Sequence, residues 1–235
     1  MIESPVTLIT GGASGIGSAT ATCLLDKGHR VAVTGRDRER LDQFAKAVDR
    51  PESLLTVSGD AADHTAVDRA VRSVVQRFGR LDNIVANAGI ATFDTLADGD
   101  PEGWREMVLT NVLGPALLIR AALTALKETR GRIILVGSLA GTRATRGNLY
   151  GATKWAVTGL AENTRMMVAE EGIRVTLIAP GRVETTFWDP AGGTPAGHSL
   201  APEHIAETIA WVIGQPDVVD VSTVVIRPID GALSK

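Results

Sequence analysis

The chain has 235 residues, of which 44% are hydrophobic and 25 are glycines, and its formal net charge is −3. This composition is typical of a globular α/β protein with one sizeable core, and it excludes the disordered and fibrous classes. Acidic and basic residues are mixed along the chain, so neither nucleic acid nor a membrane is expected as a partner.

Three further features of the sequence bear on its compartment. No apolar run approaches the roughly 20 residues that a membrane span needs, and the first residues lack the basic and apolar regions of a secretory signal. Cys23 is the single cysteine, so an internal disulfide cannot form. We therefore expect a cytoplasmic location.

Strand and helix patterns alternate along the chain. Short apolar runs predict strands at 5–10, 30–34, 54–58, 82–86, 132–136, 174–179 and 222–226. Amphipathic patterns predict helices at 18–27, 38–48, 64–78, 101–127, 149–171 and 202–213. This alternation implies right-handed crossovers and a doubly wound parallel sheet of about seven strands flanked by helices. Residues 1–235 are expected to form a single domain, in which the irregular stretch 185–201 is either disordered or a substrate lid.

A glycine-rich turn joins the first predicted strand to the first helix. Gly11, Gly15 and Gly17 let the backbone approach a pyrophosphate, which the free N–H groups of the next helix would bind. The spacing is Gly-x-x-x-Gly-x-Gly, which differs from the general Gly-x-Gly-x-x-Gly pattern. Tight turns need glycine in any case, but a place after the first strand favours a dinucleotide site.

Tyr150 is the only tyrosine in the chain and precedes Lys154 by four residues. Four residues are close to one helical turn, so both side chains should lie on one helix face. A nearby ammonium favours phenolate, and we expect it to bring the Tyr150 pKa down from about 10 toward the range of a general acid or base. The alternative is a half-buried tyrosine above a solvated lysine.

Several short motifs follow one another in a recognisable order. They are Thr10-Gly11-Gly12-Ala13-Ser14-Gly15-Ile16-Gly17, Asn87-Ala88-Gly89, Asn111, Ser138, Tyr150-x-x-x-Lys154 and Pro180-Gly181. Together they resemble the short-chain dehydrogenase/reductase family over essentially the whole chain. The resemblance implies a Rossmann-like fold and a hydride transfer between a nicotinamide coenzyme and a ketone, aldehyde or secondary alcohol.

The resemblance implies roles for four catalytic residues. Tyr150 would exchange a proton with the substrate oxygen, and Lys154 would lower its pKa and hold the nicotinamide ribose. Ser138 would hydrogen-bond the substrate oxygen, although serine after a strand is also an ordinary turn residue. Asn111 would anchor a water of a proton relay, and the alternative is a polar residue that kinks the helix near Gly114-Pro115.

The coenzyme is expected to contact several strand ends. By resemblance, Asp60 would accept a hydrogen bond from the adenine, unless it is a simple turn residue, and Asp63 is the candidate helix cap. The Val183 backbone and the Thr185 hydroxyl would hold the nicotinamide carboxamide and a phosphate. The expected coenzyme residues are Gly11, Ser14, Gly15, Ile16, Gly17, Arg36, Asp60, Ala61, Asn87, Ala88, Gly89, Tyr150, Lys154, Pro180, Gly181, Val183 and Thr185.

Arg36 follows the second predicted strand, where NAD-binding sheets usually carry an acidic residue. A carboxylate would repel a 2′-phosphate, whereas a guanidinium can bind it through two hydrogen bonds. We therefore expect NADP(H) to be preferred and NAD(H) to be possible, with Arg36 on the phosphate and Ser14 assisting. Arg38 and Arg40 are expected on a solvated helix face that Asp37 caps.

The remaining expectations concern partners. The four histidines are scattered without ligand spacing, so no metal site is expected. A small carbonyl or alcohol is the expected substrate, in a mostly apolar pocket framed by Ile90, Phe93, Leu139, Ala140, Thr142, Asn148, Arg182, Phe187 and Trp188. The resemblance implies a homodimer or homotetramer through the helices 101–127 and 149–171. The alternative function is a non-catalytic NADP-binding sensor or scaffold on the same fold.

Overall fold

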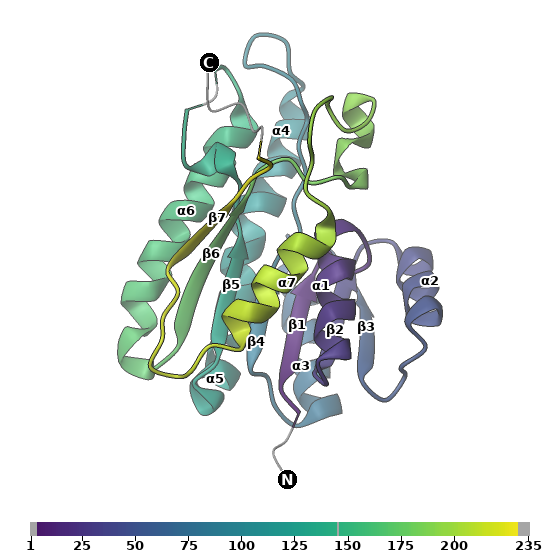
Figure 1. Ribbon diagram of the computed structural model, residues 1–235, viewed down its shortest axis with the longest axis vertical. Helices are drawn as coiled ribbons and strands as arrows, with labels where there is room; N and C mark the ends of the chain where they lie inside the picture. Colours follow the sequence, from purple (N-terminus) through teal and green to yellow (C-terminus); the bar gives the residue numbers. More distant parts are fainter. Residues whose placement is uncertain (1–3, 145, 230–235) are drawn as a thin grey trace.

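Parallel strands form the central sheet of the structure, a computed structural model that describes residues 4–144 and 146–229 (Figure 1). The sheet order is β3 (Leu54–Ser58), β2 (Arg30–Gly35), β1 (Val6–Thr10), β4 (Asn83–Ala86), β5 (Arg132–Val136), β6 (Arg174–Pro180) and β7 (Thr223–Ile226). Every neighbouring pair is parallel. The order reverses between β1 and β4, which opens a crevice at the carboxyl ends of these strands. The predicted doubly wound seven-stranded sheet is confirmed.

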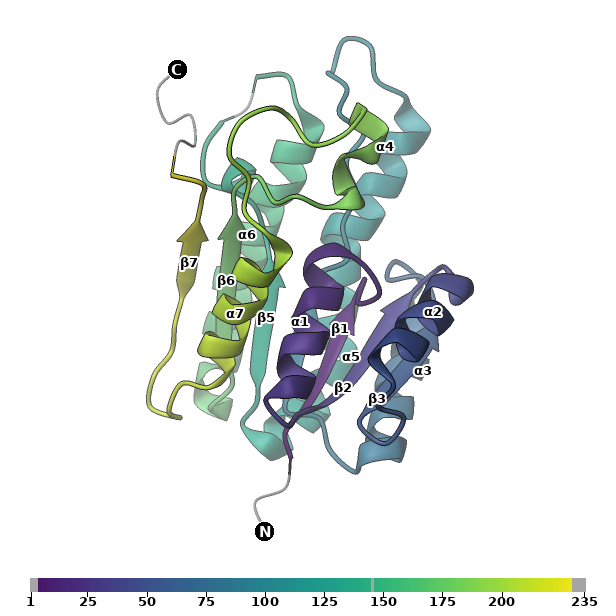
Figure 2. The same ribbon diagram turned by 45° about the vertical axis from the view of Figure 1, so that its right-hand side comes forward.

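Helices cover both faces of the sheet, as Figures 1 and 2 show. One face packs against α1 (Gly15–Asp26), α2 (Arg38–Val48) and α7 (Pro202–Ile213). The other packs against α3 (His64–Phe78), α5 (Gly114–Thr129) and α6 (Leu149–Val168). Leu8 and Ile9 are adjacent in β1 and fully buried in opposite layers. A strand covered on both sides needs apolar residues at every position, which explains the continuous apolar runs.

Most predicted boundaries lie within three residues of those in the structure. Helix α1 begins at Gly15 instead of Ser18, because the glycine turn supplies its first residues. Strand β4 begins after Asp82, whose carboxylate accepts the Val6 N–H at 2.8 Å. The last predicted turn of the helix 149–171 is a separate 3₁₀ turn, Ala169–Glu171.

The predicted helix 101–127 contains a π-helical turn. Helix α4 (Pro101–Val108) passes into the π turn Leu109–Leu113, which leads directly into α5. Pro115 has no N–H, so the Asn111 carbonyl lacks its usual α-helical partner, and this accounts for the local change in hydrogen bonding. Asn111 therefore lies in a rearranged helical turn.

The sequence suggested no apolar segment long enough to span a membrane, and the continuous helix Pro101–Thr129 corrects this expectation. By length and composition it is apolar enough to cross a membrane, and 44% of its most apolar window is buried inside the molecule. Its α5 part packs against α3 and β4. A core helix passes the same test of length and composition, so this helix is weak evidence for a membrane.

The irregular stretch after β6 rises over the carboxyl ends of the strands (Figure 2, green loop at the top). It contains the 3₁₀ helix Thr186–Ala191. Two backbone hydrogen bonds of 2.9 Å close its base, from Glu184 to Leu200 and from Leu200 to Arg182. The stretch 185–201 is thus a loop whose two ends are tied together.

Candidate active site

A cavity of about 1030 Å³ opens at the carboxyl ends of the strands, beneath this loop. Arg36 at the end of β2 and Tyr150 at the start of α6 both line it, together with Ser138 and Lys154. Asn111 and Gly17 do not. The other predicted coenzyme residues that line it are Gly11, Ser14, Gly15, Ile16, Asp60, Ala61, Asn87, Ala88, Gly89, Pro180, Gly181, Val183 and Thr185.

The glycine turn needs glycine for two different reasons. Gly11 and Gly15 have φ of 63° and 50°, in the left-handed region that L side chains rarely adopt. A Cβ on Gly17 would lie 2.1 Å from the Gly11 carbonyl oxygen, so the turn folds back tightly on α1. Ser14 is the N-cap residue, but its side chain makes no capping hydrogen bond and lines the cavity instead. The helix N-terminus therefore opens into the cavity.

Asn87 holds this turn in place. Its Nδ2 donates to the carbonyls of Thr10 at 3.0 Å and Gly11 at 3.1 Å. The backbone N–H groups of Asn87 and Ala88 both donate to the Thr10 hydroxyl. The ends of β1 and β4 are thus joined at the point where the sheet order reverses.

Asp60 lines the cavity and also forms a turn. Its Oδ1 accepts the Ala62 N–H at 2.8 Å, which is the turn role considered as an alternative from the sequence. Asp63 accepts the Thr65 N–H at 2.9 Å at the start of α3, so the predicted helix cap is confirmed. A contact between Asp60 and adenine remains a prediction.

Two arginines line the cavity at the end of β2. Arg36 forms an ion pair with Glu106 of α4, and the two side chains are 57% and 51% exposed. Arg40 also lines the cavity. The Arg38 and Arg40 side chains are 84% and 53% exposed, so both lie on a solvated face as expected. Asp37 accepts the Arg40 N–H at 3.0 Å and caps α2 as predicted. This place in the first turn, beside the strand end, is the signal that could have identified Arg40.

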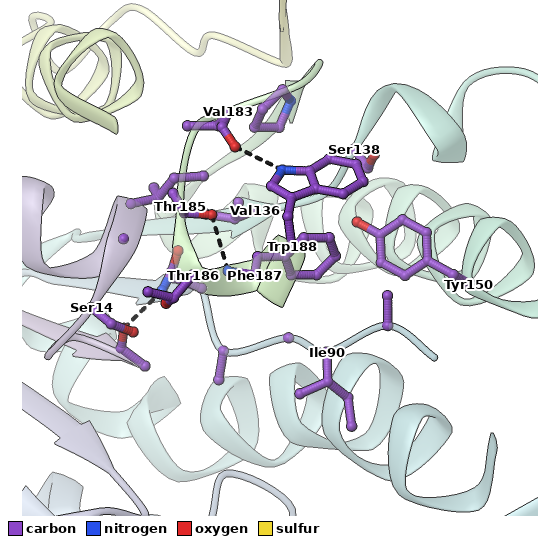
Figure 3. A pocket seen from close by; sticks show the side chains of 18 of the residues that line it. Ser14, Ile90, Val136, Ser138, Tyr150, Val183, Thr185, Thr186, Phe187 and Trp188 are labelled. Carbon is purple, nitrogen blue, oxygen red and sulfur yellow. Dashed lines mark hydrogen bonds between the residues drawn. The ribbon is translucent and has the colours of Figure 1, made fainter. Parts of the chain in front are cut away.

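Tyr150 and Lys154 lie on one face of α6, as predicted (Figure 3 shows Tyr150). Asn148 caps this helix by accepting the Gly151 N–H at 2.8 Å. The Lys154 Nζ lies 5.7 Å from the centre of the Tyr150 ring and donates to the Val136 carbonyl at 3.0 Å. Lys154 is only 5% exposed, so the alternative of a solvated lysine is wrong.

The expected lowering of the Tyr150 pKa is also wrong. Burial raises the pKa of Tyr150 to about 12, and a hydrogen bond with Ser138 opposes this only in part. Burial lowers the pKa of Lys154 to about 8. Desolvation therefore outweighs the attraction that the sequence suggested. A phenol with this pKa remains protonated at neutral pH and can donate a proton.

Ser138 lies where β5 ends and a short 3₁₀ turn, Leu139–Gly141, begins. Its Oγ accepts the Ala140 N–H at 3.1 Å and lies beside the Tyr150 hydroxyl (Figure 3). A Cβ on Gly141 would lie 2.4 Å from the Lys154 carbonyl oxygen, so this turn packs directly against α6. The packing brings the two hydroxyl groups together although they belong to different elements.

The Asn111 side chain does not line the cavity and instead hydrogen-bonds to residues that surround it. It is 1% exposed, and its Nδ2 donates to the Ile90 carbonyl at 2.9 Å and to the Thr153 hydroxyl at 3.0 Å. Its Oδ1 accepts the Ile90 N–H at 2.9 Å. These bonds join the π turn, the segment after β4 and α6. The predicted water relay to Lys154 stays a prediction.

Aromatic rings lie at the end of the cavity where Tyr150 is found (Figure 3). The Phe187 ring lies 5.7 Å from the Tyr150 ring and 5.4 Å from the Phe93 ring, measured between centroids. The Trp188 Nε1 donates to the Val183 carbonyl at 2.8 Å. Phe93 has a φ of 57°, a strained value for a non-glycine residue and one that is often found at functional sites.

The other residues predicted for the substrate pocket are mostly placed there. Ile90, Leu139, Ala140, Asn148 and Arg182 line the cavity, and Thr142 does not. The Arg182 Nη1 donates to the Ala196 carbonyl at 2.7 Å, so this guanidinium holds the loop. The predicted lid contributes Pro190, Ala196, Gly197 and His198 to the lining, although its lack of periodicity could not single them out. Residues that the sequence did not suggest also line the cavity: Thr34, Thr110, Val136, Arg227 and Pro228.

The sequence matches the family model described as short chain dehydrogenase over residues 5–194. A relative from Staphylococcus saprophyticus, described as an uncharacterised oxidoreductase, is 33% identical over 97% of this chain and 99% of its own length. A similar protein from Staphylococcus epidermidis is 32% identical over the same shares.

Two solved structures have the same fold. An alcohol dehydrogenase from Thermococcus sibiricus, complexed with 5-hydroxy-NADP, matches with a TM-score of 0.89 and 29% identity over 97% of each chain. The closed form of a serine dehydrogenase complexed with NADP+ matches with a TM-score of 0.87 and 29% identity, over 96% of this chain and 95% of the other. The chain therefore belongs to the short-chain dehydrogenase/reductase family of oxidoreductases.

Proposed function

We propose that the protein is an NADP(H)-dependent oxidoreductase that interconverts a ketone or aldehyde with the corresponding alcohol, with Tyr150 as the general acid and base. The observation that carries this proposal is that Ser138, Tyr150 and the buried Lys154 line the same cavity as the glycine turn, with the Ser138 and Tyr150 side chains next to each other. The pair offers two hydroxyl groups to one substrate oxygen.

The cavity fits a nicotinamide dinucleotide. A helix N-terminus opens into it, and the tight turn at Gly17 lets backbone N–H groups face a pyrophosphate. Residues of the turn, with Asn87, Asp60 and Thr185, would hold the coenzyme between Arg36 and Tyr150. When bound, the nicotinamide supplies a hydride to the carbonyl carbon or accepts one from the alcohol.

Tyr150, Ser138 and Lys154 carry out the proton transfer. As the carbonyl is reduced, negative charge develops on its oxygen, and the Tyr150 hydroxyl donates the proton. The Ser138 hydroxyl stabilises that charge through a second hydrogen bond. Lys154 has a pKa of about 8, so it is mostly protonated at neutral pH, and its positive charge stabilises the phenolate that remains once Tyr150 has donated its proton.

Two positive side chains support a preference for NADP(H). Arg36 and Arg40 line the cavity at the end of β2, where a 2′-phosphate would lie beside the adenosine ribose. The similar alcohol dehydrogenase and serine dehydrogenase structures are complexes with NADP-type coenzymes. The aromatic rings of Phe93, Phe187 and Trp188 suit a substrate with an apolar group next to the carbonyl.

Exposed apolar side chains support an oligomer. Leu113 at the π turn and Trp155 on α6 are 40% and 48% exposed, on the helices predicted to form the subunit contact. We expect a cytoplasmic homodimer or homotetramer. Sedimentation at micromolar concentration would measure this, and a monomer would contradict it.

The test is a panel of ketones, aldehydes and secondary alcohols with NADPH/NADP and NADH/NAD, in which wild type is compared with Tyr150→Phe. Wild type should turn over part of the panel, and Tyr150→Phe should lose roughly 10²- to 10⁴-fold in kcat/KM because no proton donor remains. NADPH binding, followed by fluorescence, should survive the substitution. Binding without turnover by wild type would instead indicate a non-catalytic NADP sensor or scaffold.

A further inference from the structure

We propose that Glu106 helps to set coenzyme specificity by competing with the 2′-phosphate of NADP(H) for Arg36; this inference rests on the proposed NADP(H) preference. Glu106 belongs to α4 and is 70 positions along the chain from Arg36. Its carboxylate holds the Arg36 guanidinium in an ion pair. The cation expected to recognise the coenzyme is therefore already bound by an anion of the protein.

The pair connects the cavity to the surface of α4. Arg36 lines the cavity, and Glu106 is not one of its lining residues. Both side chains are about half exposed, at 57% and 51%. Water can therefore hydrate the Glu106 carboxylate when the guanidinium leaves, so the cost of breaking the pair is small.

Other charged side chains near this pair have partners of their own. Arg40 faces Asp37 at 3.9 Å within the first turn of α2. On α4, Arg105 lies 3.7 Å from Glu102. Asp60 uses one carboxylate oxygen to accept the Ala62 N–H. The ion pair between Arg36 and Glu106 differs from these contacts because it joins the end of β2 to helix α4.

The two coenzymes make different demands on this ion pair. A 2′-phosphate carries about two negative charges and binds a guanidinium well, but Arg36 must first give up Glu106. NAD(H) has a hydroxyl group at this position and leaves the pair intact. Glu106 should therefore weaken NADP(H) binding and leave NAD(H) binding unchanged.

The test compares Glu106→Gln with Glu102→Gln, which removes the same charge from the same helix. NADPH and NADH are titrated by energy transfer from protein tryptophan at low and at high salt. Glu106→Gln should lower the Kd for NADPH about two- to five-fold, the range expected from an exposed ion pair, and leave the Kd for NADH unchanged. The gain should shrink at high salt. Glu102→Gln should change neither Kd.

Arg36→Gln, alone and combined with Glu106→Gln, separates competition from simple repulsion. If Glu106 acts through Arg36, its replacement should bring little gain when Arg36 is already gone. An equal gain in both backgrounds would overturn the inference, as would an unchanged or higher Kd for NADPH in Glu106→Gln alone. If Arg36→Gln instead weakened NADPH and NADH equally, the NADP(H) preference itself would fail, a result distinct from failure of Glu106→Gln alone.

Discussion

The two ends of the cavity place their positive charges in opposite surroundings. At the catalytic end, Lys154 is 5% exposed and its ammonium donates to a backbone carbonyl. At the end of β2, Arg36 is more than half exposed and binds another side chain. Burial shifts the pKa of groups at the first end, whereas water weakens electrostatic interactions at the second. We therefore expect proton transfer to depend on desolvation, and coenzyme choice to depend on ion pairs that can exchange.

The largest effect should come from the buried end. Ser138→Ala removes the second hydroxyl group from the substrate oxygen and should lower kcat/KM by roughly 10²- to 10³-fold. Steady-state kinetics measures this, and the Kd for NADPH serves as the control because Ser138 should act on the substrate. A loss below about 10-fold would mean that Tyr150 alone stabilises the oxygen.

A substitution in the glycine turn tests whether the tight packing of this turn is needed to bind the coenzyme. Gly17→Ala places a Cβ where the Gly11 carbonyl oxygen lies 2.1 Å away, and should weaken NADPH and NADH binding alike by about 10- to 100-fold, the equivalent of an overpacking cost of 1–3 kcal/mol. Gly159→Ala is the control, because that glycine lies within helix α6 and has no atom within 4 Å of the added Cβ. Circular dichroism separates lost binding from lost folding. Unchanged binding in a folded Gly17→Ala protein would contradict the account of the turn.

A substitution at the exposed end of the cavity should change the Kd for NADPH more than the Kd for NADH. Arg36→Gln should raise the Kd for NADPH about 10-fold, because a charge-assisted hydrogen bond is lost at a partly solvated site. The Kd for NADH should remain within about two-fold. Fluorescence titration of both coenzymes at matched salt gives the ratio. Equal weakening of NADPH and NADH binding would show that Arg36 supports the local fold after β2 and does not recognise the 2′-phosphate.

The smallest effect concerns stability and pH at the buried end. Because the Lys154 pKa falls from 10.5 to about 8, the unfolded chain holds a proton between these values that the folded protein has lost. The free energy of unfolding should therefore rise with pH across this window. Between pH 7 and 9.5, wild type should gain about 1–2 kcal/mol relative to Lys154→Met, measured by urea unfolding.

Lys27→Met is the matched control for this measurement. Lys27 is 46% exposed, and a hydrogen bond to Glu207 raises its pKa above 10.5, so it does not titrate in this window. It should follow wild type. If Lys154→Met showed the same rise with pH as wild type, the buried ammonium would not be the titrating group.

Local spacing made half of the site predictable. The glycine turn and the four-residue step from Tyr150 to Lys154 each lie within one short segment, so the backbone geometry of that segment alone brings the residues together. The caps at Asp37 and Asp63 were predictable for the same reason. The sheet followed from the alternation of strands and helices.

The other features of the site depend on contacts between residues far apart in the sequence, which local patterns do not show. The burial of Lys154 depends on Val136 from β5, and that of Tyr150 on Phe187 from the loop, so no local pattern could give their pKa values. Glu106 reaches Arg36 from 70 positions away. A distorted helix near Gly114-Pro115 was already one of the two interpretations of Asn111, because the missing N–H of a proline changes the bonding of the helix four residues earlier.

The bond between the Trp188 indole and the Val183 carbonyl gives the protein an internal optical reporter. Trp155 and Trp211 are 48% and 55% exposed, so both emit in a largely aqueous environment. Trp188 is less exposed and lies against Phe93 and Phe187. Trp104 is also partly buried, but it lies on α4 and donates to Asp94, outside the loop. Movement of the loop would take the Trp188 indole into water and shift its emission to longer wavelength, so the opening of the site can be timed without an added dye.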